Sequence, residues 1–291
     1  MATNSTIEWT TRTWNPVLGC SMTSPGCAHC YAERMSNRLA GMAKADKNPG
    51  RRAHYLHVIN GKGRWNGHLE PVEEALEEPM SWNQPSTVFV NSMSDLFHES
   101  VEAGFIARVF DVMNRADRHQ FQVLTKRSKR LRTLSPQLPW SPNIWQGVSV
   151  ENADYSWRVD DLRQTEVRIK FLSVEPLLGP LGAVNLSGID WVIVGGESGP
   201  GCRPMKIEWV REIRDQCLNA GVRFFFKQHG HLKNNPDKTD PTAKENGGHS
   251  KGGRMLDGRT WDEMPTVAQS SPVTLQERSH RMIQSFASSA T

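Results

Sequence analysis

The sequence predicts an α/β fold, specifically a partial (β/α) TIM-like barrel of parallel strands, and three observations support this prediction. The chain has 291 residues, a normal length for an α/β barrel with insertions. Short apolar runs alternate with segments whose apolar residues recur at helical spacing, which is the pattern of parallel βαβ units. The runs are almost continuously apolar, as expected for strands that are buried on both faces.

The expected elements follow one another in a regular order. A strand at 88–95 precedes a helix at 101–116, and a strand at 121–127 leads into a basic helix start. A glycine closes the amphipathic helix expected at 207–221. The other expected elements are strands at 143–152, 167–176, 190–198 and 222–228, and a helix at 154–164.

Nearly every predicted strand ends in polar residues. Because ligands bind at the carboxyl ends of parallel strands, these residues predict an active site on one rim. The alternative is that they are ordinary loop residues that happen to follow strands. The residues are Asn91, Ser92, Asp95, Thr125, Lys126, Arg127, Ser149, Glu151, Asn152, Ser173, Glu175, Glu197, Ser198, Lys227 and Gln228.

The chain divides into three expected parts. The barrel is expected to span 1–228, with an insertion at 42–84 over one of its faces. Residues 229–265 are expected to form a C-terminal extension that packs on the barrel, because Trp261 and Met264 are able to dock there. Residues 266–291 consist largely of Ser, Gln, Thr and Ala and are expected to be a flexible tail.

Cysteine usage and composition limit the cellular compartments and the kinds of partner that we expect for this protein. Five cysteines, three of them clustered, argue against a disulfide framework and for a reducing compartment. The start of the chain has no signal-peptide pattern, and no apolar stretch has the length of a membrane span, so we expect a cytoplasmic protein without membrane contact. The net charge of +4 permits a polyanionic partner without requiring one.

Cys20, Cys27 and Cys30 form a C-x6-C-x2-C motif. Three thiolates fall one short of a closed tetrahedral site, and they suit a [4Fe–4S] cluster with one open iron. A structural zinc site is the main alternative, with a fourth ligand from Cys202, Cys217, His29 or another histidine. Inert buried thiols are the simplest reading, but three within eleven residues argue against it.

Eight segments together resemble a known family. They are IEWTTRTWNPVLGCSMTSPGCAHCYAE, VFVNSMSDLF, VLTKR, WQGVSVEN, FLSVEPLLGP, WVIVGGESGPGCRPM, FFFKQ and LDGRTWDEMP. Over residues 7–265 they look like the phage-encoded three-cysteine proteins at the margin of the radical S-adenosylmethionine (radical SAM) superfamily. The resemblance implies a radical-SAM type barrel, a [4Fe–4S] cluster, and reductive cleavage of S-adenosyl-L-methionine to a 5′-deoxyadenosyl radical. It also implies a flavodoxin-like host reductase as electron donor and, for a phage protein, the host cytoplasm.

The chain departs from the common superfamily pattern in two places. The first cysteine gap has six residues where three are usual, and His29 occupies the usual aromatic position. The superfamily often has a GGE sequence after the second strand, where this chain has Ser92 to Asp95; its own GGE, ending at Glu197, follows a late strand. We therefore expect Asp95 to bind the amino group of the cofactor. His29 is expected either to stack on adenine or to bind a metal.

The other rim residues receive expected roles on the same basis. The cofactor would contact His29, Ser92, Asp95 and Lys126, with Ser149, Glu151 and Asn152 at the ribose. Glu175, Glu197 and Cys202 are the catalytic candidates, although ion pairing for the carboxylates and an idle thiol for Cys202 remain open. The substrate would contact Arg127, Arg203 and Lys227.

The substrate is expected to be a nucleobase in phage DNA, modified by an isomerase-type step toward a hypermodified thymidine. The basic run at 126–132 suits phosphate contact, although a solvated helix face is the more common reason for such a run. Two alternatives stay open. One is a radical SAM enzyme acting on tRNA, peptide or a small metabolite, and the other is a non-catalytic, zinc-stapled nucleic-acid-binding protein.

Overall fold

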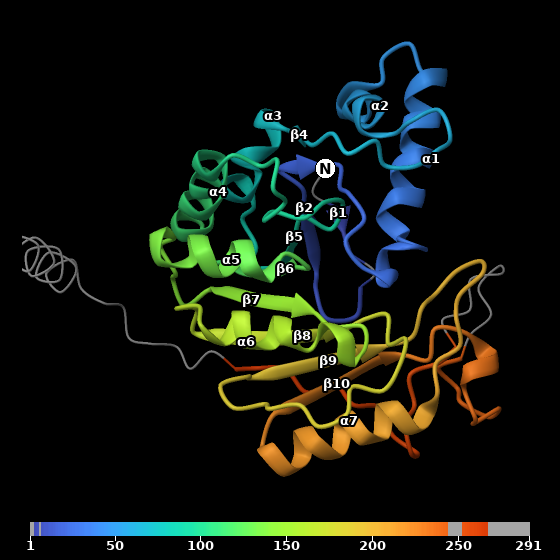
Figure 1. The fold of residues 1–291 in the computed structure, drawn as a ribbon. Coiled ribbons are helices and arrows are strands. Elements are labelled where there is room, and N and C mark those ends of the chain that lie inside the picture. The colour runs from blue at the N-terminus through green and yellow to red at the C-terminus, as the bar shows by residue number, and fades with distance from the viewer. Residues whose placement is uncertain (1–2, 6, 244–251, 267–291) are drawn as a thin grey trace, which may run out of the picture.

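A curled sheet of seven parallel strands forms a half-barrel in the computed structural model, which describes residues 3–5, 7–243 and 252–266 (Figure 1). The strands lie side by side in chain order, as they do in a (β/α) barrel. The short strand β1 (Thr3–Asn4) adds to one edge in the antiparallel direction. The seven are β2 (Arg12–Trp14), β5 (Thr87–Val90), β6 (Gln120–Thr125), β7 (Ile144–Ser149), β8 (Ile169–Val174), β9 (Trp191–Gly195) and β10 (Arg223–Gln228).

Helices cover the outer face of this sheet (Figure 1). In α4, the apolar residues Phe105, Ile106, Val109 and Phe110 are buried against the sheet at helical spacing. The α7 helix ends at Gly221, whose φ of 67° is the left-handed conformation that glycine favours. The outer helices are α4 (Ala103–Arg115), α5 (Ser128–Leu134), α6 (Trp157–Arg163) and α7 (Ile207–Ala220), and short 3-10 helices lie at η4 (Ser135–Gln137) and η5 (Ala153–Tyr155).

The strands alternate between two apolar clusters because successive side chains point to opposite faces of a sheet. The outward residues join the main core beneath the helices, as Val192 and Val194 do in β9. The inward residues form an aromatic cluster that fills the lower part of the half-barrel: Trp9, Phe89, Trp145, Phe171, Trp191, Ile193 and Phe225. The upper part, at the carboxyl ends of the strands, is left to polar side chains.

The segment between α1 (Tyr31–Ala45) and β5 is built from short elements, of which the first lie beside α1 and the later ones beside α4 (Figure 1). Its start at residue 42, as predicted from the sequence, falls inside α1. A small cluster that includes Leu18, Tyr55 and Val58 packs it against the chain before the cysteine motif. Its elements are η2 (Gly50–His54), α2 (Tyr55–Val58), β4 (Glu70–Pro71), α3 (Glu73–Leu76) and η3 (Glu78–Ser81), and β4 pairs antiparallel with β3 (Val17–Leu18).

The chain after β10 folds back onto the barrel. A 3-10 helix, η6 (Leu232–Asn234), follows β10, and Trp261 then packs its ring edge-on against Phe224, with 5.6 Å between ring centroids. The amide of Phe226 donates to the carbonyl of Trp261 at 2.9 Å. The predicted flexible tail lies outside the described residues from 267 onward. Among the described residues, no helix is long and apolar enough to cross a membrane.

Candidate functional site

A cavity of about 250 Å³ opens at the carboxyl edge of the half-barrel. Aromatic side chains such as Trp9 and Phe89 line its lower part, and polar strand ends line its rim. The structure brings twelve of the sixteen candidate residues together in this lining: Cys20, Cys27, His29, Cys30, Ser92, Asp95, Lys126, Arg127, Ser149, Glu175, Glu197 and Lys227. The rim therefore gathers most of the residues that the strand-end pattern singled out.

The loop of residues 19–30 carries the three cysteines over the cavity. It begins at Gly19, whose φ of 88° is left-handed and whose Cβ, if present, would lie 2.3 Å from the carbonyl oxygen of His68. The loop then passes through η1 (Pro25–Cys27) and enters α1 directly after Cys30. All three thiols are free, partly buried and in contact with the cavity.

The spacing of the three sulfur atoms bears on the kind of metal they suit. They do not all lie within 4.8 Å of one another, and no described histidine or carboxylate joins them in a group that compact. Tetrahedral zinc holds its thiolates about 3.8 Å apart, as its bond length of about 2.3 Å requires. An iron–sulfur cube binds each thiolate through a different iron and so needs a wider triangle. Among the described residues, the three sulfurs therefore do not form a group as compact as a single ion needs.

The environment of Cys20 and Cys30 favours the neutral thiol over the thiolate. Burial raises the pKa of Cys20 to about 12, and the nearby carboxylate of Asp95 raises it further than Arg127 lowers it. Burial also raises the pKa of Cys30. Without a cation, both thiols stay protonated at neutral pH. A metal centre would supply the charge that converts them to thiolates.

Glu151 joins the cysteine loop to the end of β7. Its side chain is fully buried, pairs with Lys126, and accepts from Nη1 of Arg158 at 2.9 Å. It also accepts from the hydroxyl of Ser24 at 2.5 Å, and a Cβ on Gly26 would lie 2.6 Å from its Oε1. Burial raises the pKa of Glu151, but Lys126, Ser24 and Arg158 together outweigh burial and hold the pKa below its usual range. Glu151 therefore fixes the loop just before Cys27, and it does not line the cavity.

Glu197 makes a second connection, from the end of β9. Its Oε2 accepts from Nδ1 of His29 and from Nε of Arg203, both at 2.9 Å, and Nη1 of Arg203 donates to the carbonyl of Pro25 at 3.0 Å. Burial raises the pKa of Glu197, but the bonds from Arg203 and His29 outweigh it and bring the pKa to about 2. The glutamate of the GGE sequence thus positions the histidine between Cys27 and Cys30.

Asp95 makes the third connection, after β5. Its Oδ2 accepts from Nη1 of Arg127 at 3.0 Å, and its Oδ1 accepts from the hydroxyl of Thr125 at 2.7 Å. Arg127 in turn donates to the hydroxyl of Ser21 at 2.9 Å and lies 3.9 Å from the sulfur of Cys20. Backbone amides of Phe97 and Lys126 also donate to Asp95, so four donors already occupy its two oxygens.

Asn91 is a cavity residue that the sequence placed on the rim without a specific role. It follows β5, lies in the left-handed conformation with a φ of 57°, and is 3% exposed. Neither atom of its side-chain amide has a hydrogen-bond partner in the protein, although it lines the cavity. A buried amide without partners is costly, so this one points to a ligand. Its only signal in the sequence is its place directly after an apolar strand.

The remaining candidates have local partners or lie away from the cavity. Glu175 pairs with Lys227 at 3.0 Å on the rim, and Ser92 donates to Oδ1 of Asn15 at 3.1 Å. Four of the sixteen candidates, Glu151, Asn152, Cys202 and Arg203, do not line the cavity. Asn152 caps η5 by accepting from the amide of Asp154, and Cys202 lies partly buried in the loop before α7.

Most basic side chains in the run at 126–132, after β6, pair with other groups of the protein. Lys126 and Arg127 pair with Glu151 and Asp95, and Arg130 donates to backbone carbonyls. Arg132 pairs with Asp161 at 2.8 Å. Most of the positive charge in this run therefore stabilises the strand ends and their helices.

Comparison with protein-family models gives a match over most of the chain. A family model described as "Protein of unknown function (DUF5131)" matches residues 4–265. That range takes in the half-barrel, the insertion, and the chain that folds back after β10. No curated protein matches the chain, and no solved structure matches it.

Proposed function

We propose that this chain, which belongs to the DUF5131 family, is an iron–sulfur enzyme of the radical SAM type. The observation that carries the proposal is the triangle of Cys20, Cys27 and Cys30, held over a cavity at the carboxyl edge of a half-barrel. When bound there, a [4Fe–4S] cluster with an open iron would supply the site for S-adenosyl-L-methionine and the electron that cleaves it to a 5′-deoxyadenosyl radical.

The three carboxylate connections support this assignment. Asp95, Glu151 and Glu197 lie after β5, β7 and β9, and each fixes a different part of the cysteine loop, Asp95 through Arg127 and the other two directly. A loop held at three points presents its thiols in a fixed triangle, which a preorganised cluster site needs. Cys30 and Tyr31, at the end of the loop, line the cavity.

Asn91 is the residue we propose for the amino-acid end of the cofactor. That end carries an ammonium donor and a carboxylate acceptor, and the amide offers a matching acceptor and donor. Asn91 lies at the end of the second parallel strand, next to the residues that the resemblance assigns to the same role. Asp95 has its oxygens already occupied, so its part is to hold Arg127.

The substrate we propose is a nucleobase, modified in phage DNA by an isomerase-type rearrangement. The resemblance to phage-encoded proteins supports this choice, and so does the aromatic lower wall of Trp9 and Phe89, since aromatic rings suit a flat base. A base in duplex DNA would have to be flipped out to reach the cavity. The half-exposed Tyr31, which also lines the cavity, offers a further ring for stacking.

The first experiment tests the chemistry. Protein purified without oxygen and reconstituted with iron and sulfide is expected to hold about four irons and to release 5′-deoxyadenosine from S-adenosyl-L-methionine under reducing conditions. Replacing any of Cys20, Cys27 or Cys30 by Ser should abolish both the binding of four irons and the release of 5′-deoxyadenosine. Cys217→Ser is the matched control, because this thiol is buried in α7 away from the cavity. A wild type that holds only zinc would defeat the proposal.

The second experiment tests the substrate. Nucleosides from phage DNA made with the active enzyme are compared, by mass spectrometry, with those made with Cys30→Ser. A new nucleoside that depends on Cys30 supports a DNA base. An unchanged profile alongside normal 5′-deoxyadenosine production would overturn the nucleobase and leave the radical chemistry standing.

A further inference from the structure

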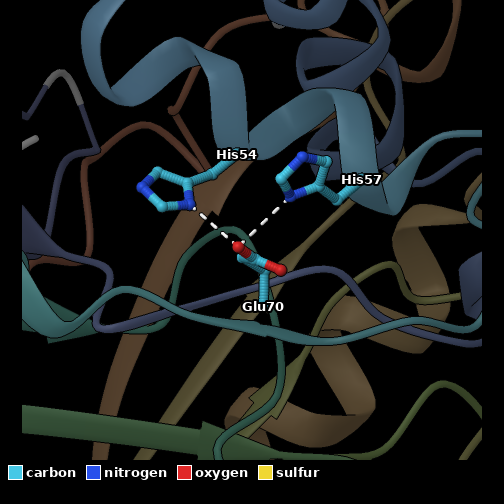
Figure 2. A group of neighbouring side chains, drawn as sticks. All are labelled: His54, His57 and Glu70. Atoms are coloured by element: carbon cyan, nitrogen blue, oxygen red, sulfur yellow. Dashed lines mark hydrogen bonds and ion pairs between the residues drawn. The ribbon is translucent and has the colours of Figure 1, made fainter.

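Outside the cavity, two imidazoles converge on one carboxylate in the insertion. Nδ1 of His54 and Nδ1 of His57 lie 3.0 and 3.2 Å from Oε1 of Glu70. Figure 2 shows both rings turned toward this carboxylate. All three ligand atoms lie within 4.8 Å of one another, the one such group of His, Cys, Asp and Glu among the described residues. We propose that His54, His57 and Glu70 form a second metal site, which binds a divalent transition metal such as zinc.

The local backbone explains why the two histidines face the same way. His54 ends η2 and His57 lies in α2, which follows without a break. Residues three apart on a helical segment lie on the same face. Glu70 comes from β4, on the facing strand, so the site joins two elements of the insertion. Helix and strand each hold their ligands in a fixed direction, as a metal site requires.

The groups around the three ligands have the arrangement that metal sites use. Nε2 of His54 lies 2.8 Å from Oε1 of Glu74, so the ring nitrogen facing away from the site contacts a carboxylate. Nε2 of His68 lies 3.0 Å from the second oxygen of Glu70. Metal-ligating histidines nearly always donate their other N–H to such a partner, and ligating carboxylates are themselves hydrogen-bonded.

The chemistry of the ligands selects the metal class. Imidazole and carboxylate suit zinc and its neighbours, whereas magnesium and calcium prefer oxygen ligands alone. The site contains no thiol, so it does not share the ligand chemistry of the cysteine loop. His57 has 58% of its side chain exposed, which leaves water free to complete the coordination.

The site lies on the path to the cysteine motif. Glu70 is paired in register with Leu18 of β3, two residues before Cys20. Gly19 approaches the backbone of His68 so closely that a Cβ would lie 2.3 Å from its carbonyl oxygen. A metal bound to Glu70 would therefore stiffen the strand that leads into the cysteine loop.

The test uses the full chain with Cys20, Cys27 and Cys30 replaced by Ser, stripped of metal with a chelator and titrated with zinc chloride. One equivalent of zinc is expected to bind. His54→Ala and Glu70→Gln should each weaken binding at least tenfold, and Glu74→Gln should weaken it about 10- to 100-fold through the outer contact. His231→Ala is the matched control, since its ring lies in the C-terminal part and caps η6.

X-ray absorption at the zinc edge gives a readout that does not depend on the variants. Nitrogen and oxygen ligands at about 2.0–2.2 Å are expected, with no sulfur. If the cysteine variant does not fold, the same spectrum is recorded on the wild type with its cluster in place. Absence of bound zinc, a sulfur shell, or affinity unchanged in both His54→Ala and Glu70→Gln would overturn the site.

Discussion

The cysteine loop and the histidine group of the insertion are held in opposite ways. The loop is tied by carboxylates that are almost fully buried, with Glu151 at 0% and Glu197 at 6% exposed. The histidine group lies at the surface, where His57 and His68 keep more than half of their side chains exposed. Buried charges are strongly destabilising when one partner is lost, whereas exposed pairs contribute little. The loop is thus preorganised by the protein, and the insertion site would depend on its metal.

The sharpest test of this difference is Glu151→Gln. It leaves the positive charges of Lys126 and Arg158 without their buried partner, so we expect a loss of about 3–5 kcal/mol in the free energy of unfolding. Urea unfolding measures the loss, and iron content after reconstitution should fall with it. Glu99→Gln is the control: its carboxylate also pairs with an arginine, Arg127, but is 69% exposed, so about 0–1 kcal/mol is expected. Equal effects of the two variants would contradict the comparison.

The stabilising effect of a buried carboxylate on the cysteine loop can also be tested by changing the pH, and Glu197 is the residue for this test. Its pKa falls from an ordinary 4.5 to about 2 in the folded protein, so its bonds to Arg203 and His29 stabilise the fold above pH 4.5 and are lost as the pH falls toward 2. Glu197→Gln should lower the free energy of unfolding by about 1.5–3 kcal/mol at neutral pH. The gap between variant and wild type should close below pH 4.5, as followed by urea unfolding. A gap as large at pH 2.5 as at neutral pH would mean that the charge of Glu197 is not what matters.

Asn91→Gly tests a group that the fold itself does not use. Glycine adopts the left-handed φ freely and the amide has no partner to lose, so the free energy of unfolding should change by less than about 1 kcal/mol. The dissociation constant for S-adenosyl-L-methionine should rise at least about tenfold, because hydrogen bonds to charged groups contribute about 1.5–3 kcal/mol. Equilibrium binding to the reconstituted protein measures it.

The control for Asn91 is Asn152→Gly. This asparagine also follows a strand, but it caps η5 and does not line the cavity. Its replacement should leave cofactor affinity unchanged. If Asn152→Gly weakens the binding of S-adenosyl-L-methionine as much as Asn91→Gly does, the amide of Asn91 has no specific role in binding this cofactor.

The α/β class and the parallel strands were predictable because most of the strands are compact apolar runs and several of them are followed by helical patterns. The predicted strand at 190–198 appears as β9, shortened because Glu197 and Ser198 belong to the rim. The strand β2 was not found from its residues, since Arg12 and Thr13 leave no apolar run in a three-residue strand. Local pattern identifies buried strands well and short, partly exposed strands poorly.

The sequence predicted which residues lie together on the rim, but it did not predict which of their side chains contact one another. Parallel strands bring their carboxyl ends to one edge, so the rim followed from strand order alone. Which partner Glu151 or Arg127 takes depends on side-chain direction and on a loop more than a hundred residues away in sequence. The histidine group was missed for the same reason, because Glu70 meets His54 and His57 only after the insertion folds back.

Glu70→Gln has the smallest expected effect, and it separates the two regions most cleanly. Without metal, its partners are exposed enough that the free energy of unfolding should change by about 0–1 kcal/mol. With free zinc at 100 times its dissociation constant, binding should stabilise the chain lacking Cys20, Cys27 and Cys30 by about 2.7 kcal/mol, and Glu70→Gln should remove most of that gain. Urea unfolding with zinc and with chelator measures both values. If zinc stabilises the Glu70→Gln chain as much as its parent, zinc binds elsewhere. If Glu70→Gln lowers the free energy of unfolding strongly without zinc, the insertion, like the cysteine loop, is held by its own charges.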